Sequence, residues 1–318
     1  MAERPIESVA TAVVPYGDDA IARAARLVAE GQPVAVPTET VYGLAADARN
    51  AEAVARIYAA KGRPDFNPLI VHVPDLAVAG RLGVFGAAEL ALAEAFWPGP
   101  LTLVVPRAHD CPVASIATAG LDTIAIRVPA HRAMRALLET TGAPLAAPSA
   151  NASGRVSPTK AEHVLASLDG RIALVIDDGA TTAGVESTIA RVADGAVQLL
   201  RPGPVTAAML GAASGLRVSG RKGAEVVAPG MLASHYAPGK PVRLGAADFA
   251  ADEYGIGFGG VAGDYQLSAA GDLTEAAAHL FDALHAGAAS AKPKIAVAAI
   301  PFEGLGAAIN DRLARAAV

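Results

Sequence analysis

One stretch, residues 34–73, restricts the fold more than any other part of the chain. It begins with a short apolar run at residues 34–36, continues through a polar segment and a helical pattern at 51–60, and closes with an apolar run at 69–73. Asn50 is a typical N-cap for that helix, and a glycine and a proline soon after it favour its end. A strand, a polar loop, a helix, a basic loop and a second strand in this order predict an α/β sheet.

Polar side chains gather where these two strands are expected to end. Open α/β sheets bind ligands at strand ends and in the loops that leave them, so we expect these side chains to meet in one crevice. Lys61 and Arg63 share one loop, and their ammonium and guanidinium groups could reach one polyphosphate. A K-x-R taken alone is more often a solvated basic loop, but the neighbouring PTETVYGL and NPLIVHV are unusual for such a loop. The residues expected in this crevice are Thr40, Lys61, Arg63, Asn67 and His72.

Three motifs carry a resemblance to a known family. PTETVYGL at 37–44, KGRPDFNPLIVHV at 61–73 and PSAN at 148–151 occur in the order found in the YrdC/Sua5 family of threonylcarbamoyl-AMP synthases, which the chain resembles. Members of that family bind L-threonine and ATP and carry a K-x-R with a distant S-x-N. A turn is the plain interpretation of a short S-x-N motif, and the presence of K-x-R favours a nucleotide contact instead.

The length of 318 residues is sufficient for two domains, and 53% hydrophobic residues predict a packed core. Strand and helix patterns with one hairpin signal predict an α/β domain with a mixed sheet over residues 1–211. Residues 212–240 are rich in Gly, Ser, Ala and Pro and predict a linker. Residues 241–318 predict a small α/β domain. The resemblance implies the same plan: a YrdC-like domain with a twisted mixed sheet, a linker ending in SHYAPGKPV, and a small Rossmann-like C-terminal domain.

The resemblance also assigns residues to the two substrates. Arg127 lies in an otherwise apolar strand pattern, where its charge must point outward, pair or face a ligand, and the resemblance favours the threonine carboxylate. Ser157 is expected to head a helix, as an N-cap, a phosphate contact or both. A lone histidine such as His72 is more often structural, and only its context favours threonine. The threonine set is Thr40, His72, Arg127, Ala147 and Ser187; the ATP set is Lys61, Arg63, Asn67, Thr123, Ser149, Asn151, Ser157, Arg201 and Tyr236, with Lys61 and Arg63 catalytic.

The implied reaction converts L-threonine, bicarbonate or carbon dioxide, and ATP into threonylcarbamoyl-AMP and pyrophosphate. Mg²⁺ is expected to enter with ATP, and no protein-held metal is expected. The product is the donor for N6-threonylcarbamoyladenosine at position 37 of tRNA, so the machinery that transfers it to tRNA is the expected downstream partner. Tyr236 and the linker are expected to close over ATP as a gate.

Charge and cysteine content exclude several other classes. The net charge of −5 gives no general attraction to nucleic acids or acidic membranes, and no apolar run is long enough to span a bilayer. Cys111 is the single cysteine, which excludes an intrachain disulfide and a thiolate zinc cluster and suits a reducing cytoplasm. Two alternatives stay open: an RNA-binding YrdC-like module without adenylation activity, and carbamoyl adenylation in hydrogenase maturation, which a single cysteine disfavours. The sequence does not decide whether tRNA is bound directly.

Overall fold

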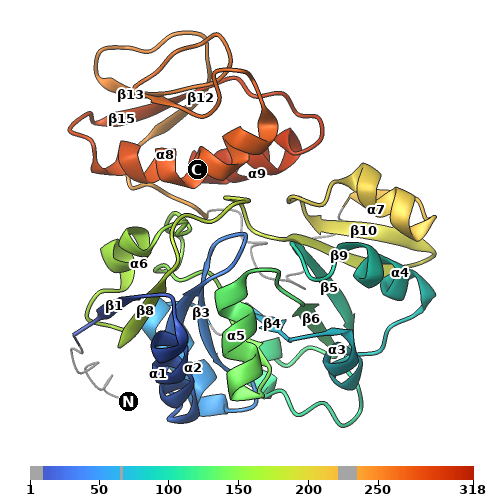
Figure 1. The fold of residues 1–318 in the computed structure, drawn as a ribbon. Coiled ribbons are helices and arrows are strands. Elements are labelled where there is room, and N and C mark those ends of the chain that lie inside the picture. Colours follow the sequence, from blue (N-terminus) through green and yellow to red (C-terminus); the bar gives the residue numbers. More distant parts are fainter. Residues whose placement is uncertain (1–9, 65–66, 221–234) are drawn as a thin grey trace.

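A computed structural model describes residues 10–64, 67–220 and 235–318 and divides them between a larger domain and a smaller C-terminal domain (Figure 1). The described residues of the larger domain form an 11-stranded sheet in the order β1-β8-β2-β3-β7-β4-β6-β5-β9-β10-β11. Its strands are β1 (Ala12–Pro15), β2 (Val34–Pro37), β3 (Tyr42–Asp47), β4 (Ile70–His72), β5 (Leu101–Pro106), β6 (Thr123–Arg127), β7 (Leu145–Ala146), β8 (Leu174–Asp177), β9 (Thr188–Ala193), β10 (Ala196–Arg201) and β11 (Val218–Gly220).

The sheet is mixed, as the sequence predicts. β4 pairs parallel with β6, whereas β2 with β3, β5 with β6 and β9 with β10 are antiparallel pairs. Helices cover both faces of the sheet (Figure 1). They are α1 (Asp18–Ala29), α2 (Ala51–Lys61), α3 (Leu76–Leu82), α4 (Ala87–Phe96), the 3-10 turn η1 (Ser115–Thr118), α5 (Arg132–Thr141), α6 (Ala161–Leu168) and α7 (Ala207–Ser214).

Side-chain alternation along β2 separates the two faces of the core. Val34 and Val36 pack with α1 and α5, whereas Ala35 lies in the cluster that contains residues of α2 and α6. Successive side chains of a strand point to opposite faces, so a strand with helices on both sides is apolar throughout. This explains why residues 34–36 form a continuous apolar run.

The predicted polar loop after residue 37 is wrong, because residues 42–47 form strand β3. β3 pairs antiparallel with β2, with Val34 opposite Ala45 and Pro37 opposite Tyr42. The turn between them is closed by the Thr38 hydroxyl, which accepts hydrogen bonds from the backbone N–H groups of Thr40 and Val41. Thr40 therefore lies in a tight hairpin turn rather than in an open loop.

The helix predicted from Asn50 is present as α2. The Asn50 side chain accepts hydrogen bonds from the N–H groups of Glu52 and Ala53, which are two of the unpaired donors at the helix start. Gly62 ends the helix in the left-handed conformation at φ 58°, which glycine adopts without strain. Lys61 is therefore the last residue of α2, and Arg63 follows it directly after Gly62.

The domain boundary expected near residue 211 falls inside α7. The chain then continues into β11, which pairs parallel with β10, so the larger sheet extends to Gly220. Small residues in this segment predicted a linker, although Leu210 is fully buried and anchors the helix. Residues 221–234 of the expected linker lie outside the described residues.

The smaller domain has four parallel strands in the order β12-β15-β13-β14, among its described residues, and two helices. Its helices lie between its sheet and the larger domain (Figure 1). Its elements are β12 (Val242–Ala246), β13 (Glu253–Gly257), β14 (Tyr265–Gln266), α8 (Leu273–Ala289), β15 (Lys294–Ala298) and α9 (Gly306–Ala316). No helix in the described part of the chain is long and apolar enough to cross a bilayer.

Apolar and charged contacts join the two domains. Val41, Val156 and Val185 of the larger domain lie in one buried cluster with α8 residues. Gly184 lies against the α8 backbone so closely that a Cβ there would meet the carbonyl oxygen of Ala277 at 2.3 Å. The contact is therefore packed tightly enough to fix the orientation of the domains.

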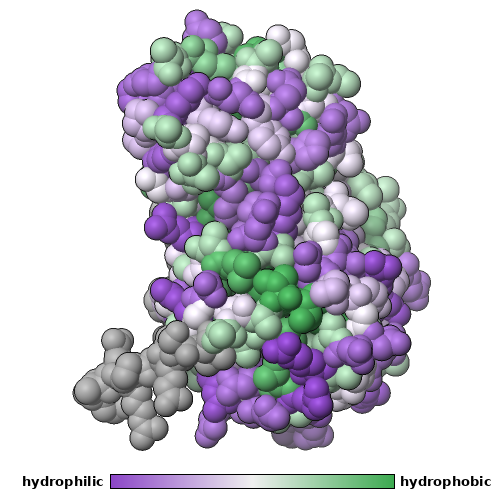
Figure 2. Space-filling view, turned by 60° about the vertical axis from the view of Figure 1, so that its left-hand side comes forward, coloured by the Kyte–Doolittle hydropathy of each residue, from purple (hydrophilic) through white to green (hydrophobic). Residues whose placement is uncertain are grey.

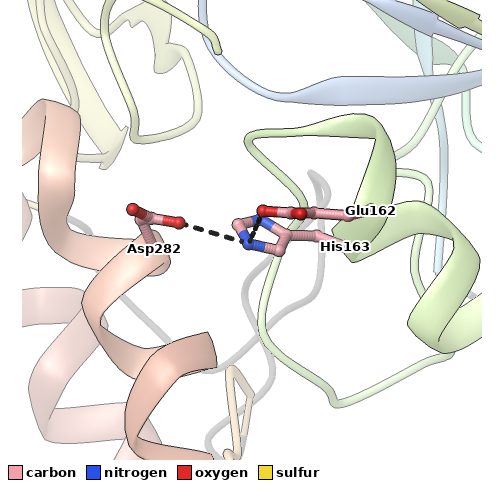
Figure 3. Close-up of side chains that lie close together, drawn as sticks. All are labelled: Glu162, His163 and Asp282. Atoms are coloured by element: carbon pink, nitrogen blue, oxygen red, sulfur yellow. Dashed lines mark ion pairs between the residues drawn. The ribbon is translucent and has the colours of Figure 1, made fainter. Parts of the chain in front are cut away.

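A cluster of charged side chains also lies at this domain boundary (Figure 3). The ring Nε2 of His163 on α6 is 3.3 Å from Asp282 on α8 and 3.9 Å from Glu162. Lys160 also contacts Asp282 at 2.9 Å, and the Thr159 N–H donates to His163 Nδ1. These partners make the cluster an interdomain ion pair.

On the face shown in Figure 2, hydrophilic residues cover most of the surface, and a patch of hydrophobic residues lies on the larger domain.

Candidate active site

One cavity in the described structure collects most of the residues that the sequence predicts. It lies where the β2–β3 turn, the ends of β4 and β6, and the loop after β7 come together. Its other side is closed by residues 186–187, by Arg201 and by the segment that enters the smaller domain. The predicted residues that line it are Thr40, Arg63, His72, Arg127, Ala147, Ser149, Ser187, Arg201 and Tyr236.

The K-x-R and S-x-N motifs meet at this cavity. The Lys61 ammonium donates to the backbone carbonyl of Ser149 at 2.5 Å and to the backbone carbonyl of Asn151. Lys61 is only 3% exposed, and burial and then the nearby Arg63 charge hold its pKa well below the ordinary value. No carboxylate among the described residues hydrogen-bonds to this ammonium. A buried cation held by carbonyl dipoles is suited to an anionic ligand.

Arg63 lies beside Lys61 on the cavity wall. Its guanidinium donates to the backbone carbonyls of Asn67 and Pro68, the latter at 3.1 Å. Burial lowers its pKa to about 10, so it stays charged at neutral pH. Arg63 thus lines the cavity directly, whereas Lys61, the last residue of α2, lies behind its Ser149 segment.

We call the side of the cavity formed by Thr40, His72 and Arg127 the Arg127 wall. Arg127 ends β6, and its guanidinium donates to Thr40 Oγ1 at 2.9 Å and to the carbonyl of Gly99. It also pairs with Glu39 at 2.8 Å. Burial raises the pKa of Glu39, but the charge of Arg127 together with hydrogen bonds from Arg127 and the backbone gives a net downward shift. Arg127 therefore both pairs with an acid and lines the cavity.

His72 adds a neutral ring to the Arg127 wall. Burial and the Arg127 charge lower its pKa to about 3, so the ring is uncharged at neutral pH. Its Nδ1 is buried and has no hydrogen-bond partner among the described residues. An unpaired buried ring nitrogen costs about 1–3 kcal/mol, which a ligand group in the cavity would recover.

We call the opposite side the Arg201 wall; it contains Glu186, Ser187, Arg201 and Tyr236. The Arg201 guanidinium donates to the Ser187 carbonyl at 2.9 and 3.0 Å and to its hydroxyl at 3.1 Å. The Ser187 hydroxyl also lies 2.8 Å from that of Thr102. Burial lowers the pKa of Arg201 to about 10. Ser187 was predicted to bind threonine and Arg201 to bind ATP. The two side chains therefore hydrogen-bond to each other directly although they were predicted to serve different substrates.

Tyr236 closes the Arg201 wall from the segment between the domains. It is fully buried, its ring stacks on Phe281 of α8 at 5.3 Å, and its backbone adopts φ 67°. A positive φ is uncommon for a residue other than glycine and marks a position that its surroundings fix. Its hydroxyl is buried without a partner among the described residues. Tyr236 is therefore not an exposed aromatic on the domain surface.

Five predicted residues do not line the cavity. Lys61, the last residue of α2, lies behind it and bonds to the backbone of Ser149. Asn151 lies behind it, bonded to Lys61, and Asn67 is buried beneath the loop of Arg63. Thr123 begins β6 and Arg127 ends it, so the two lie at opposite ends of that strand. Ser157 does not head the helix, which begins at Ala161 after Lys160.

The position of Ser157 has a structural cause. The carbonyl of Pro158 accepts a hydrogen bond from the Tyr42 N–H, which ties this segment to β3. The Ser157 hydroxyl instead donates to Glu186 at 2.6 Å. The sequence prediction of an N-cap at Ser157 is therefore wrong, and the serine contacts the Arg201 wall through Glu186.

Sequence reasoning missed Glu186 and His235, which also line the cavity. Glu186 directly precedes Ser187, and His235 directly precedes Tyr236, so each adjoins a residue that was assigned. Burial raises the pKa of Glu186, but the charges of Arg312 and Arg201 outweigh it and bring the pKa to about 2. Burial lowers the pKa of His235 to about 3.

Known proteins resemble this chain over most of its length. A threonylcarbamoyl-AMP synthase of Bacillus subtilis is 42% identical over 94% of this chain and 93% of its own length. One of Pyrococcus abyssi is 45% identical over 69% of this chain and 66% of its own. The crystal structure of P. abyssi Sua5 complexed with L-threonine matches with a TM-score of 0.86 at 35% identity, covering 97% of each chain.

Two family models match consecutive parts of the chain, and they meet just before α7. The model for Sua5, YciO and YrdC, described as telomere recombination, matches residues 26–203. The model described as threonylcarbamoyl-AMP synthase, C-terminal domain, matches residues 205–318. The chain therefore belongs to the Sua5/YciO/YrdC family and carries the C-terminal domain of its Sua5-type members.

Proposed function

We propose that this protein is an L-threonylcarbamoyladenylate synthase, a nucleotidyltransferase that makes threonylcarbamoyl-AMP and pyrophosphate from L-threonine, bicarbonate and ATP. The observation that carries the proposal is the convergence of Arg63, Arg127 and Arg201 on one cavity, with two separate cationic walls. Lys61 supports it from behind, through its hydrogen bond to the carbonyl of the lining residue Ser149. One wall suits an amino-acid carboxylate and the other a polyphosphate. The names of the similar proteins support the same activity.

The Arg127 wall is the proposed threonine site. The substrate carboxylate would bind the Arg127 guanidinium, and the uncharged His72 ring would hydrogen-bond the substrate. Thr40 orients Arg127 through its hydroxyl. Ala147 lines this cavity as a small apolar residue and leaves room for the substrate methyl group.

The Arg63 and Arg201 side chains form the proposed clamp for ATP. The threonine amine first captures the one-carbon unit to give a carbamate. A carbamate oxygen then attacks the α-phosphorus, and the bond to pyrophosphate breaks. Negative charge builds on the phosphoryl oxygens and on the departing pyrophosphate, so fixed cations lower this barrier. Lys61 and Arg63 are the residues we assign to that step.

Mg²⁺ belongs to this proposal as a companion of ATP. Glu186 is the carboxylate on the described lining of the cavity, and Ser157 and Arg312 already engage its two oxygens. We therefore assign the ion to the phosphate oxygens of the substrate. Transfer of the product to tRNA by other proteins and a cytoplasmic location complete the proposal. The named relatives are synthases, which does not favour an RNA-binding module without activity.

A pyrophosphate-release assay tests the proposed function. The protein is supplied with MgATP and bicarbonate, and L-threonine is compared with other amino acids and with no amino acid. We expect release that depends on both threonine and bicarbonate, with threonylcarbamoyl-AMP detected by mass spectrometry. Release that is independent of threonine, or no release at all, would contradict the assignment.

A further inference from the structure

The Arg201 wall contains an acid that should oppose the binding of an anion. Glu186 lines the cavity, is 6% exposed and holds its charge at neutral pH. An uncompensated carboxylate here would repel phosphate and would attract the Arg201 guanidinium. The structure must therefore neutralise Glu186 if Arg201 is to serve a nucleotide.

Arg312 of the smaller domain provides this neutralisation. It lies on α9, is fully buried, and its Nε donates to Glu186 Oε2 at 2.9 Å. The other oxygen of Glu186 accepts from the Ser157 hydroxyl, so the carboxylate is satisfied from two sides. In the part of the chain that the structure describes, the Arg201 guanidinium hydrogen-bonds to Ser187 and not to Glu186.

Arg312 also holds the backbone on the other side of Arg201. Its guanidinium donates to the carbonyl of Pro202 at 2.8 Å. The chain at Gly203 passes so close to the Glu186 segment that a Cβ there would meet the Thr188 nitrogen at 2.4 Å. One side chain from the smaller domain thus holds the two segments that carry Ser187 and Arg201.

The Tyr236 ring lies beside the same guanidinium, 5.7 Å from the Arg312 Cζ atom. Arg312 therefore contacts or adjoins three parts of the Arg201 wall and does not itself line the cavity. We propose that Arg312 is a positioning residue for nucleotide binding: it cancels the charge of Glu186 and so keeps Arg201 directed at the phosphates of ATP. This rests on the proposed function, because it assigns the Arg201 wall to ATP.

The test measures the dissociation constants of ATP and L-threonine separately by calorimetry on the full chain. Arg312→Met leaves Glu186 buried without its partner, and we expect ATP affinity to fall by about ten-fold or more, with threonine affinity within about two-fold of the original. Arg243→Met is the control, since Arg243 lies in the same domain, half-exposed, and pairs with Glu253. It should change neither constant.

The double variant Glu186→Gln/Arg312→Met separates charge balance from simple support of the structure. It removes both charges, so we expect ATP affinity to return to within about three-fold of the original. A double variant that binds ATP no better than Arg312→Met, or that does not fold, would overturn the proposal. Should Arg312→Met alone not fold, the double variant still decides it, because normal ATP affinity without Arg312 requires that its role was to cancel Glu186.

An unchanged ATP constant in a folded Arg312→Met protein would also overturn the proposal. A different result would contradict the proposed function. If the original protein binds ATP but releases no pyrophosphate with threonine and bicarbonate, the activity is wrong, and the calorimetry still tests the role of Arg312.

Discussion

The two walls of the cavity differ in what holds them in place. The Arg127 wall is bonded within the larger domain, where Arg127 contacts Gly99, Thr40 and Glu39. The Arg201 wall is backed by the smaller domain, through Arg312 on Glu186 and Phe281 on Tyr236. This difference indicates that the contacts of threonine with Arg127 and His72 depend on one domain, whereas nucleotide affinity depends on how the two domains dock.

Substrate choice is the largest effect that the Arg127 wall should produce. The buried Nδ1 of His72 lacks a partner, so valine, which has no hydroxyl, would leave a polar group unpaired. Sites that hydrogen-bond a substrate hydroxyl reject the analogue without it by about 10⁴-fold or more. Serine lacks only a methyl group and should be about 10–200-fold poorer. Ratios of kcat/KM from the pyrophosphate assay give both numbers. Equal rates for threonine and valine would show that the site does not recognise the substrate hydroxyl.

Among substitutions in the Arg127 wall, loss of Arg127 should weaken threonine binding most. Arg127→Ala removes the proposed carboxylate partner and leaves Glu39, whose side chain is 12% exposed, without its ion pair, at a cost of up to about 3–5 kcal/mol. We expect lost threonine binding and a lower melting temperature, with ATP affinity retained in the folded fraction. The double variant Arg127→Ala/Glu39→Gln should recover the melting temperature but not threonine binding. Recovery of both would show that Arg127 has only a structural role.

Loss of Lys61 tests the chemical step on the nucleotide side. Lys61→Ala removes a buried cation, and losing one contact to developing charge costs about 2.7–4 kcal/mol in the transition state. We expect kcat to fall by about 10²–10³-fold while circular dichroism stays unchanged. Arg49→Ala is a matched control, because that cation is 45% exposed and pairs with Asp47. Near-normal turnover of folded Lys61→Ala would remove this residue from the mechanism.

The partly exposed ion pair between the domains should matter least. Lys160 is 37% exposed and contacts Asp282 at 2.9 Å. Pairs of this kind typically contribute about 0.2–1 kcal/mol, so Lys160→Met should lower the free energy of unfolding by no more than that. Denaturant titration measures it. A loss of several kcal/mol would mean that docking depends on this cluster more than on the apolar contact around Gly184.

Part of this site could be predicted from the sequence. Lys61 ends a helix with a clear cap and break, and Ser149 and Asn151 follow an apolar run, so their proximity could be inferred. The β3 strand was hidden because Thr38 and Thr40 resemble loop residues, although a hydroxyl-closed turn joins two strands there. The Glu186–Arg312 pair could not be inferred, because it joins residues 126 apart through the docking of two domains.

Substitution of Gly184 gives the most direct test that domain docking serves the nucleotide and not threonine. Gly184 has φ +67°, and a Cβ there would lie 2.3 Å from a backbone oxygen of α8, so Gly184→Ala should push the smaller domain away. Gly179→Ala is the matched control, since Gly179 has φ +76° and no atom within 4 Å of the added Cβ.

Calorimetry then measures the dissociation constants of ATP and L-threonine for each variant. We predict that Gly184→Ala weakens ATP binding by about ten-fold or more relative to Gly179→Ala and leaves threonine binding within about two-fold. Equal weakening of both substrates, or no change in ATP binding, would contradict the division of the cavity into one wall held by a single domain and one held by two.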